Sequence, residues 1–514
     1  MITLTVDGVE VEVEDGATVL QACEAAGKEV PRFCYHERLS IAGNCRMCLV
    51  EMERAPKPIA SCAMPAGNGM VIKTDTPVVK KAREGVMEFM LIKHPLDCPI
   101  CDQGGECDLQ DQAMGYGTAE SRYLEPKRAV ENKNMGPLIS TIMTRCIHCT
   151  RCVRFSTEVA GVNDMGAIGR GESMEITTYL EKALGSELSG NVVDLCPVGA
   201  LTNRPYAFNA RSWELSHTES FDAMDAVGSA IRIDTRGNEV MRVLPRVNDD
   251  VNEEWISDKT RHAIDGLKRQ RIDRPYLRQR NGRLAECSWE DAFKAIQTKI
   301  KKAKPDAIGA IMGDQCDAES MFALKSLMEN LGSANIDCRQ DGSVLGGQGR
   351  GGYIFNSGFN GLEETDYVLL LGSNPRHEAA VVNARLRRGW LNDGLEVARI
   401  GAEVDLTYPV KELGDDPSLL MAMDGGKSPV LSKLKKAKKP MIIIGQGALN
   451  RADSSAILGA LSRIAKDAGV VTASWNGFNV LHTAAGRVAG LDRGAIPARG
   501  GKDTTAMLKA AKSG

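Results

Sequence analysis

Twelve of the 15 cysteines lie before residue 200, and most of them fall into groups with the short spacings of metal-ligand sets. Thiolates bind iron–sulfur clusters or zinc, and they form disulfides mainly in secreted proteins. The chain opens directly with a strand-like run rather than the basic leader and apolar core of a signal peptide. We therefore expect reduced, metal-binding thiols and a protein that works in the cytoplasm or on the reducing side of a membrane.

The first set is Cys34, Cys45, Cys48 and Cys62, with 10, 2 and 13 residues between them. A 2Fe–2S cluster needs four thiolates, which plant-type ferredoxins supply as a loop set plus a distant fourth. Small residues around Cys45 allow backbone amides to approach the cluster sulfides and to tune the potential. The first gap is longer than in the plant-type pattern, so the loop differs. The spacing favours a 2Fe–2S cluster, with zinc as the alternative.

The second set is His94, Cys98, Cys101 and Cys107, with gaps of 3, 2 and 5 residues. Three thiolates and an imidazole can hold either a 4Fe–4S cluster or a structural zinc. The position between two ferredoxin-like sets favours the cluster. A neutral imidazole in place of a thiolate makes the site less negative, which raises the reduction potential.

The third set is Cys146, Cys149 and Cys152, with the two-residue gaps of a bacterial ferredoxin, completed by Cys196 before a proline. A two-cluster ferredoxin places a further cysteine after three more residues, where this chain has Ser156. Counting back from Cys196 by the same pattern meets only Val192, Ser189 and Ser186. The pattern therefore indicates a two-cluster ferredoxin module that kept one 4Fe–4S cluster. His36 and His148 adjoin complete four-thiol sets and are interpreted as bystanders.

Three clusters without an open coordination position favour electron relay over catalysis. No Ser/His/Asp or Cys/His pairing stands out by spacing, so we expect no catalytic residue in the chain. The formal charge of −3 argues against nucleic-acid binding, and no apolar run reaches the roughly 18–20 residues of a membrane span.

The first 30 residues predict a β-hairpin around an Asp-Gly turn at positions 7 and 8, followed by a helix. Thr18 and Gln21 have the spacing of a capping box, and Gly27 is expected to end the helix. Cys23 lies on the apolar face of that helix and is interpreted as a core thiol rather than a ligand.

From about residue 211 the pattern becomes that of an α/β domain. Apolar runs at 308–313, 368–372 and 441–445 each end in glycine and precede a helix-compatible segment. Such loops can cradle phosphates, although a glycine after a buried strand is as often a tight turn, and we favour the turn. A lysine-rich run at 433–439 is interpreted as a solvated face.

In this order the motifs resemble those of the large iron–sulfur subunit of respiratory complex I, the family of the mitochondrial 75-kDa subunit and its bacterial counterpart. The resemblance spans essentially the whole chain and is most specific at 31–48, 94–112, 144–154 and 193–202. It implies a multidomain α+β and α/β protein with a β-grasp 2Fe–2S ferredoxin-type domain (1–78), a His/Cys₃ 4Fe–4S domain (79–119), a ferredoxin-like 4Fe–4S domain (120–210) and a molybdopterin-oxidoreductase-like domain (211–514).

Segments 372–375 and 383–387 carry the likeness to molybdopterin enzymes. Active members often begin this domain with a further cysteine cluster set, whose spacing here falls on Ser220, Ala223 and Val227. We therefore expect no additional cluster and no molybdopterin, and a domain retained as scaffold and subunit interface. The resemblance also implies that the chain ends earlier than members of the complex I subunit family usually do.

The resemblance further implies that electrons arrive from a flavin-bearing, NADH-oxidising subunit and leave through a downstream iron–sulfur subunit toward quinone. It implies a peripheral location on the cytoplasmic face of the bacterial inner membrane, or on the matrix side if mitochondrial, with no direct membrane span. The main alternative is a molybdenum-dependent oxidoreductase such as an NAD-linked formate dehydrogenase subunit. An iron-only hydrogenase needs four later cysteines, and only Cys287, Cys316 and Cys338 remain, without an assigned role.

Overall fold

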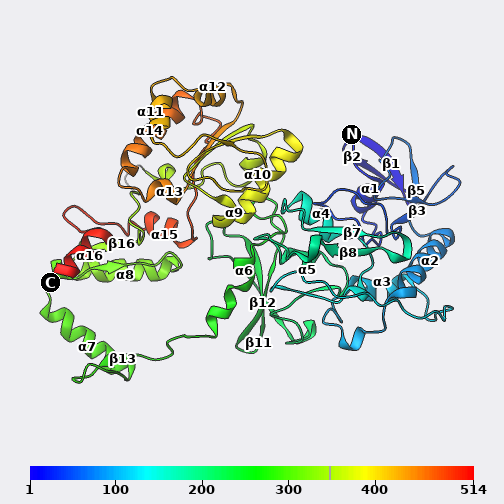
Figure 1. Cartoon of the computed structure of the whole chain (residues 1–514), viewed down its shortest axis with the longest axis horizontal. Helices are drawn as coiled ribbons and strands as arrows, with labels where there is room; N and C mark the ends of the chain where they lie inside the picture. Colours follow the sequence, from blue (N-terminus) through cyan, green and yellow to red (C-terminus); the bar gives the residue numbers. More distant parts are fainter. Residues whose placement is uncertain (346–348, 514) are drawn as a thin grey trace. The chain divides into compact units, whose positions relative to one another are not determined.

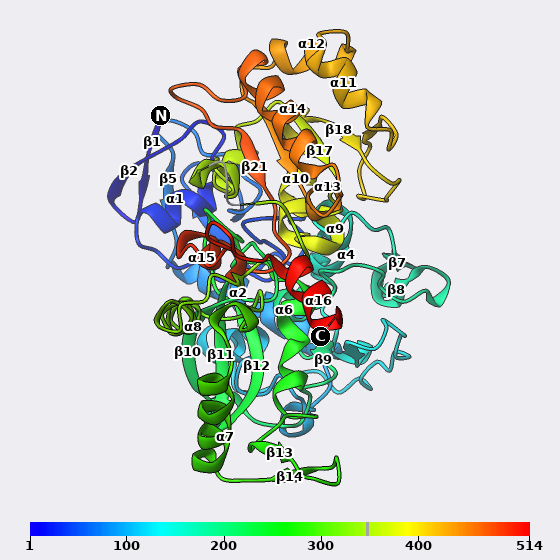
Figure 2. The ribbon, with the colours of Figure 1, turned by 90° about the vertical axis from the view of Figure 1, so that its left-hand side faces the viewer.

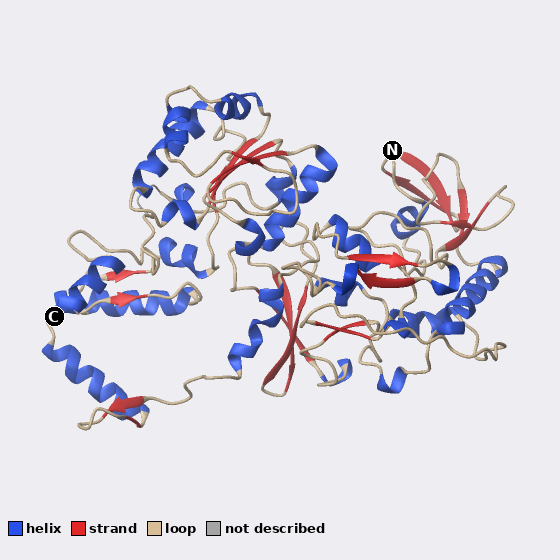
Figure 3. Ribbon diagram, in the orientation of Figure 1, coloured by secondary structure: helices blue, strands red, loops and turns tan. Residues whose placement is uncertain are grey.

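The computed structural model describes residues 1–345 and 349–513 of the 514. The chain divides into two compact units, of which the first comprises Met1–His217 and Asp234–Met241, and the second comprises Thr218–Ile233 and the chain from Arg242 onwards. Helices and strands are mixed throughout (Figure 3). No helix in the described ranges is long and apolar enough to cross a membrane.

The chain begins with a five-stranded sheet of order β2-β1-β5-β3-β4 (Figure 1). Its strands are β1 (Ile2–Val6), β2 (Val9–Val13), β3 (Leu49–Met52), β4 (Ile59–Ala60) and β5 (Val71–Lys73). The expected hairpin is confirmed, because β1 and β2 pair antiparallel and Asp7 and Gly8 both have positive φ, 48° and 85°. The alternating apolar side chains of β1 face the core, where Leu4 and Val6 are buried.

Helix α1 (Val19–Ala25) confirms the predicted capping box, since Thr18 accepts from the Gln21 amide and Gln21 accepts from the Thr18 amide. Gly27 follows the helix with φ 68°, the left-handed conformation that commonly ends a helix. Cys23 is fully buried in the core of this sheet, as expected, and burial raises its pKa to about 12.

Two helices and a 3₁₀ turn frame the segment after this sheet: α2 (Pro77–Lys93), η1 (Cys98–Ile100) and α3 (Asp108–Tyr116). Helix α2 starts where Thr76 accepts from the Val79 amide at 3.2 Å. Residues 118–138 contain no helix or strand and connect this segment to the next.

The ferredoxin-like segment consists of two antiparallel strand pairs and two short helices. The strand pairs are β6 (Ile139–Thr141) with β9 (Leu201–Asn203), and β7 (Met165–Ile168) with β8 (Glu175–Thr178). The helices are α4 (Arg151–Glu158) and α5 (Asn191–Leu195). A three-stranded sheet follows, formed by β10 (Ser216–Phe221), β11 (Ala230–Arg236) and β12 (Glu239–Pro245), whose strands lie side by side in Figure 2. Helix α6 (Asp258–His262) comes next.

The C-terminal sheet is parallel, with the order β19-β18-β17-β20-β21. Its strands are β17 (Tyr367–Leu371), β18 (Glu396–Ile400), β19 (Lys411–Glu412), β20 (Pro440–Ile444) and β21 (Phe478–Val480). Helices α9 (Pro375–Glu378) and α10 (Ala380–Asp393) lie on one side of it, and α13 (Gln446–Leu449) and α14 (Ser454–Asp467) on the other (Figure 1). Every residue of β17 and β20 is buried, which explains their continuous apolar sequences.

The predicted strands at 368–372 and 441–445 correspond to β17 and β20. The run at 308–313 forms only a two-residue strand, β15 (Ala310–Ile311), which pairs with β16 (Ile336–Asp337) outside the large sheet. The other elements of the second unit are β13 (Tyr276–Arg278), β14 (Leu284–Glu286), α7 (Trp289–Lys302), α8 (Ala318–Asn330), α11 (Ser418–Asp424), α12 (Pro429–Lys436), α15 (Gly486–Asp492) and α16 (Thr504–Ser513).

Candidate metal centres

The structure brings the four thiols of the first set together. Cys34 precedes β3, Cys45 and Cys48 lie in the loop leading into that strand, and Cys62 follows β4. Cys34, Cys48 and Cys62 are at most 1% exposed. A hydrogen bond from Cys45 lowers the pKa of Cys34, and one from Cys62 lowers the pKa of Cys48, because each thiol stabilises its neighbour's thiolate.

Backbone amides also point at these sulfur atoms. The Cys34 amide donates to Cys45 Sγ at 3.4 Å, and the Asn44 and Met47 amides stabilise the thiolates of Cys34 and Cys45. Gly43 has a φ of 61°, which glycine adopts without strain. The amides of this loop point at cysteine sulfur atoms, and four thiolates with such donors match the needs of a negatively charged cluster.

Three members of the second set, His94, Cys98 and Cys107, line a cavity of about 590 Å³ together with apolar residues of α2 and α3. His94 ends α2, Cys98 begins η1, and Cys107 immediately precedes α3. Cys101 does not line this cavity but lies close enough to Cys107 to raise the latter's pKa, behind the main effect of burial. The four side chains therefore belong to one continuous segment, from the end of α2 through η1 to the start of α3.

His94 has the features of a metal ligand. Burial lowers its pKa to about 4, with the charge of Lys127 adding to the effect, so the imidazole is neutral at physiological pH. Its Nδ1 atom is buried without a hydrogen-bond partner. A neutral imidazole with a buried, unpartnered nitrogen has the donor atom that metal binding requires.

The third set occupies the loop from η2 (Met143–Arg145) into α4, with Cys196 directly after α5. His148 and Thr150 have positive φ, 54° and 61°, so the loop turns sharply between the cysteines. The His148 amide donates to Cys146 Sγ at 3.4 Å. Burial raises the pKa of Cys152 well above its ordinary value, and the neighbouring thiols of Cys149, Cys146 and Cys196 add to this, which places all four near one another.

The residues at the positions where a second ferredoxin cluster would need cysteines are packed in the interior. Ser156 is fully buried and donates its hydroxyl to the Val162 carbonyl at 2.6 Å. Val192 and Ser189 are also buried. This supports the interpretation of the module as one that holds a single cluster. His148 is half-buried, and burial lowers its pKa. His36 accepts from the Arg38 amide at 3.2 Å. Both histidines adjoin sets that already have four thiols.

Sequence reasoning missed the buried or half-buried arginines around these sets. Arg154 and Arg151 on α4 donate to backbone carbonyls of the first set's loop, at Cys34 and Tyr35. Arg145 donates to Asp97 at 3.1 Å and leaves its Nη1 atom buried and unpartnered. The only sequence signal was the closeness of these arginines to the third set, which does not reveal the distant acceptors.

Among residues 1–345 and 349–513, no group of three or more His, Cys, Asp or Glu side chains is placed to hold a single metal ion. The support for cluster binding is therefore the convergence of the thiols, the amides aimed at sulfur and the orphaned His94 nitrogen.

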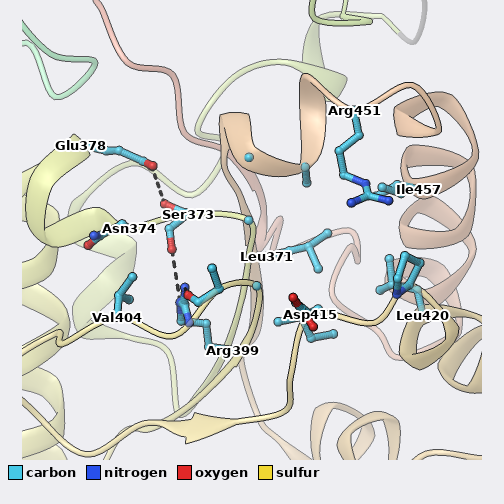
Figure 4. Close-up of a pocket in the computed structure, with 17 residues that line it drawn as sticks. Leu371, Ser373, Asn374, Glu378, Arg399, Val404, Asp415, Leu420, Arg451 and Ile457 are labelled. Carbon is cyan, nitrogen blue, oxygen red and sulfur yellow. Dashed lines mark hydrogen bonds between the residues drawn. The ribbon is translucent and has the colours of Figure 1, made fainter.

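A cavity of about 400 Å³ lies at the carboxyl ends of β17, β18 and β20 (Figure 4). Ligands of parallel α/β sheets bind at this edge, where the chain order reverses. Here the glycine loops pack on each other, because the Gly447 amide donates to the Gly372 carbonyl at 2.9 Å and the Gly445 amide to the Leu371 carbonyl at 2.8 Å. A Cβ on Gly372 would lie 2.4 Å from the Ala448 nitrogen. The favoured interpretation as tight turns agrees with these contacts.

Two charged groups of this cavity, Arg399 and Glu378, are also engaged. Arg399 is buried, pairs with Glu412 at 2.9 Å and donates to the Ser373 carbonyl at 3.4 Å. Ser373 in turn donates to Glu378 at 2.8 Å (Figure 4).

The lysine-rich run at 433–439 forms surface ion pairs such as Lys435 with Asp467, which fits the expected solvated face.

The segment around Ser220, Ala223 and Val227 does not fit an iron–sulfur cluster, since no cysteine lies between 197 and 286. Buried carboxylates occur there instead. Asp222 accepts from the Thr260 hydroxyl at 2.8 Å, and Asp225 accepts from the Val227 amide at 2.9 Å.

Comparison with known proteins gives five consecutive matches to family models. They are a 2Fe–2S iron–sulfur cluster binding domain (1–77), an NADH-ubiquinone oxidoreductase-G iron–sulfur binding region (83–122), the ferredoxin-like domain of NADH-quinone oxidoreductase subunit 3 (136–202), an NDSU1/NuoG-like 4Fe–4S domain (215–265) and molybdopterin oxidoreductase (271–513). The predicted fold class is thereby confirmed. The fourth match bears a 4Fe–4S name although its segment in this chain lacks cysteine.

Three relatives illustrate the similarity. The mitochondrial NADH dehydrogenase [ubiquinone] iron–sulfur protein 1 of Solanum tuberosum is 56% identical over 97% of this chain and 67% of its own length. The NADH-quinone oxidoreductase G subunit of Rickettsia bellii is 56% identical over 96% and 72%. The NADH-ubiquinone oxidoreductase 75 kDa subunit of Reclinomonas americana is 53% identical over 96% and 73%.

Among solved structures, an NAD⁺-reducing [NiFe]-hydrogenase matches 41% of this chain and 90% of its own at 28% identity, with a TM-score of 0.38, too low to support an argument. The relatives and the subunit-specific family models agree with one another, and the chain belongs to the family of the large iron–sulfur subunit of complex I, which includes the 75 kDa subunit of mitochondria and its bacterial counterpart.

Proposed function

We propose that this chain is an electron-relay subunit of NADH:quinone oxidoreductase. The observation that carries the proposal is that all twelve candidate ligands lie in one compact unit, in which the thiols of the first and third sets interact with one another and three members of the second set line one cavity. The sets are Cys34, Cys45, Cys48 and Cys62 for a 2Fe–2S cluster; His94, Cys98, Cys101 and Cys107 for a 4Fe–4S cluster; and Cys146, Cys149, Cys152 and Cys196 for another 4Fe–4S cluster.

Iron–sulfur clusters supply reversible one-electron transfer. The residues of this chain would fix the ligand positions, bury most of the thiols, although Cys98 is exposed, and direct amides toward sulfur in the first and third sets. The domain division proposed is 1–78, 79–119, 120–210 and 211–514, the first three each carrying one ligand set. Because each set offers four ligands, relay is the activity that the donor chemistry supports, and the chain needs no catalytic residue of its own.

The C-terminal domain is proposed to act as scaffold and subunit interface without molybdopterin. The packed glycine loops and the engaged Arg399 support this, as does the absence of cysteines from the fourth segment. The names of the relatives do not favour a formate dehydrogenase.

The partners proposed are the other peripheral-arm subunits of the complex, including the flavin-bearing NADH-oxidising subunit and the downstream iron–sulfur subunit. The location proposed is peripheral, on the cytoplasmic face of a bacterial inner membrane or on the matrix side.

Elemental analysis of the anaerobically purified protein tests this function. The ligand sets sum to about ten irons with matching sulfide per chain, and no molybdenum. Zinc in place of four irons would reassign the His94 set, and near-stoichiometric molybdenum would move the active site to the C-terminal domain. A variant in which Cys101 and Cys149 are both replaced by serine is the reference for the iron count, because its second and third sets each lack one ligand.

A further inference from the structure

Arg154 on α4 connects the first and third ligand sets directly. Its Nη2 donates to the carbonyl of Cys34 and, at 3.2 Å, to the carbonyl of Cys149. Its Nη1 donates to the carbonyl of Ser40, and its Nε to the Thr150 hydroxyl at 3.3 Å. One guanidinium thus joins two proposed ligand residues that are 115 positions apart in the sequence.

The charge of this guanidinium is held away from water. Arg154 is 9% exposed, and its four acceptors are three carbonyls and a hydroxyl, all uncharged. The charged groups that act on it besides the thiols are Glu158 and Arg151, of opposite sign. Burial lowers the pKa of Arg154, yet arginine stays protonated in proteins.

A buried cation strengthens the binding of negative charge nearby, because the low dielectric of the interior screens it weakly. Reduction adds one electron to a cluster, so a cation beside the ligands favours the reduced form and raises the potential. Nearby charge and hydrogen bonding are among the factors that set cluster potentials.

Arg151, one turn earlier on the same helix, is arranged differently. It donates to the Tyr35 carbonyl at 2.7 Å and the Leu195 carbonyl at 3.4 Å, which adjoin ligands without belonging to them. It also approaches the carboxylate of Asp108 at 3.9 Å. Arg154 differs in contacting the ligand residues themselves through uncharged acceptors.

We propose that Arg154 is a positioning residue that holds the Cys34 and Cys149 loops together and raises the reduction potentials of both clusters bound there. The inference rests on the ligand sets of the proposed function and assigns to them a shared element that couples the two centres. Arg154 binds no iron itself and acts through the two ligand residues.

Redox titration followed by electron paramagnetic resonance of the purified, cluster-loaded full chain tests the proposal. In Arg154→Gln, the ratio of reduced to oxidised cluster at the wild-type midpoint potential is expected to fall about tenfold for the first and third sets, equivalent to about 59 mV for one electron. The signal of the His94 cluster, which Arg154 does not contact, is expected to keep its midpoint. Arg154→Lys, which retains the charge, is expected to restore most of the shift.

Arg170→Gln is the control, because Arg170 is an exposed arginine in the same unit and its loss changes the net charge equally. Unchanged midpoints in Arg154→Gln with full iron content would overturn the proposal, as would an equal shift in Arg170→Gln.

If Arg154→Gln fails to assemble clusters, the iron content per chain distinguishes a positioning role from a general folding defect. Loss confined to the about six irons of the two joined sets supports the positioning role, whereas loss of all three signals indicates a general folding defect and overturns it. A wild-type protein that lacks either signal would instead refute the ligand sets of the proposed function, whatever the variants do.

Discussion

Replacing Gly199 by alanine is expected to disturb the His94 cluster site selectively. A Cβ built on Gly199 lies 2.3 Å from Cys101 Sγ and 3.1 Å from the Cβ of Gln103. Both distances are shorter than the 3.5–4.0 Å at which nonbonded atoms attract. The methyl group can be accommodated only if the thiol of Cys101 or the backbone beside Cys196 moves.

The cost follows from overpacking of a buried site, about 1–3 kcal/mol of unfolding free energy. Because the closest atom is a candidate ligand, we expect the variant to lose much of the iron of the second set, up to about four atoms per chain, and to keep the 2Fe–2S signal. Iron analysis and electron paramagnetic resonance measure this loss, and thermal unfolding of the purified protein measures the stability change.

Gly115→Ala is the matched control. Gly115 lies on α3 in the same segment, and its Cβ would meet nothing within 4 Å. Alanine there should be neutral or stabilise the helix by about 0.5–1 kcal/mol. If Gly199→Ala kept full iron, an unchanged second-set signal and the wild-type unfolding temperature, the close approach of Gly199 to Cys101 would be unimportant and the reasoning refuted.

Three further predictions concern single side chains. Cys149→Ser should abolish one 4Fe–4S signal and stop NADH-driven quinone reduction in the assembled complex, since a ligand thiolate is lost; unchanged spectra and turnover would contradict the third set. His94→Cys should keep a cluster at a lower potential because a negative charge is added, and a redox titration that shows a rise or no shift would count against His94 as a ligand. Burial and the neighbouring Asp222 raise the pKa of Asp225 to about 6 from 3.8, so the folded chain binds more protons between these values and stability falls as pH rises through that window. Asp225→Asn should remove this pH dependence and raise the free energy of unfolding at pH 7 by at most about 3 kcal/mol. Urea unfolding at pH 4 and pH 7 measures the change. If the free energy of unfolding changed equally with pH in the variant and the wild type, the pKa shift of Asp225 would be contradicted.

Local features of the fold could be predicted because short stretches of chain determine them. The Asp-Gly turn needs two adjacent residues with positive φ, and the capping box needs only Thr18 and Gln21 on one helical turn. The burial of Cys23 followed from its position on the apolar face of that helix. The buried strands β17 and β20 were visible as uninterrupted apolar runs, whereas the run at 308–313 looked alike and yielded only a two-residue strand.

The ligand sets were largely visible for a similar reason. Three of four ligands in the second and third sets lie within a few residues of one another, so spacing constrains them before any folding is considered. The prediction of a single ferredoxin cluster rests on Ser156, which occupies the position where a second cluster would need a cysteine. The distant members, Cys62 and Cys196, could be assigned only by completing a set of four.

The sequence by itself thus determined the local turns and the family, and it supplies the proposed donor atoms, since each depends on residue types at short spacing. Only the tertiary structure decided what surrounds the donors. The bridge of Arg154 to Cys34, the approach of Gly199 to Cys101 and the packing of Gly447 on Gly372 join residues 75 to 120 positions apart. Such contacts depend on how whole elements pack, and packing is set by the combined burial of many side chains rather than by any local pattern.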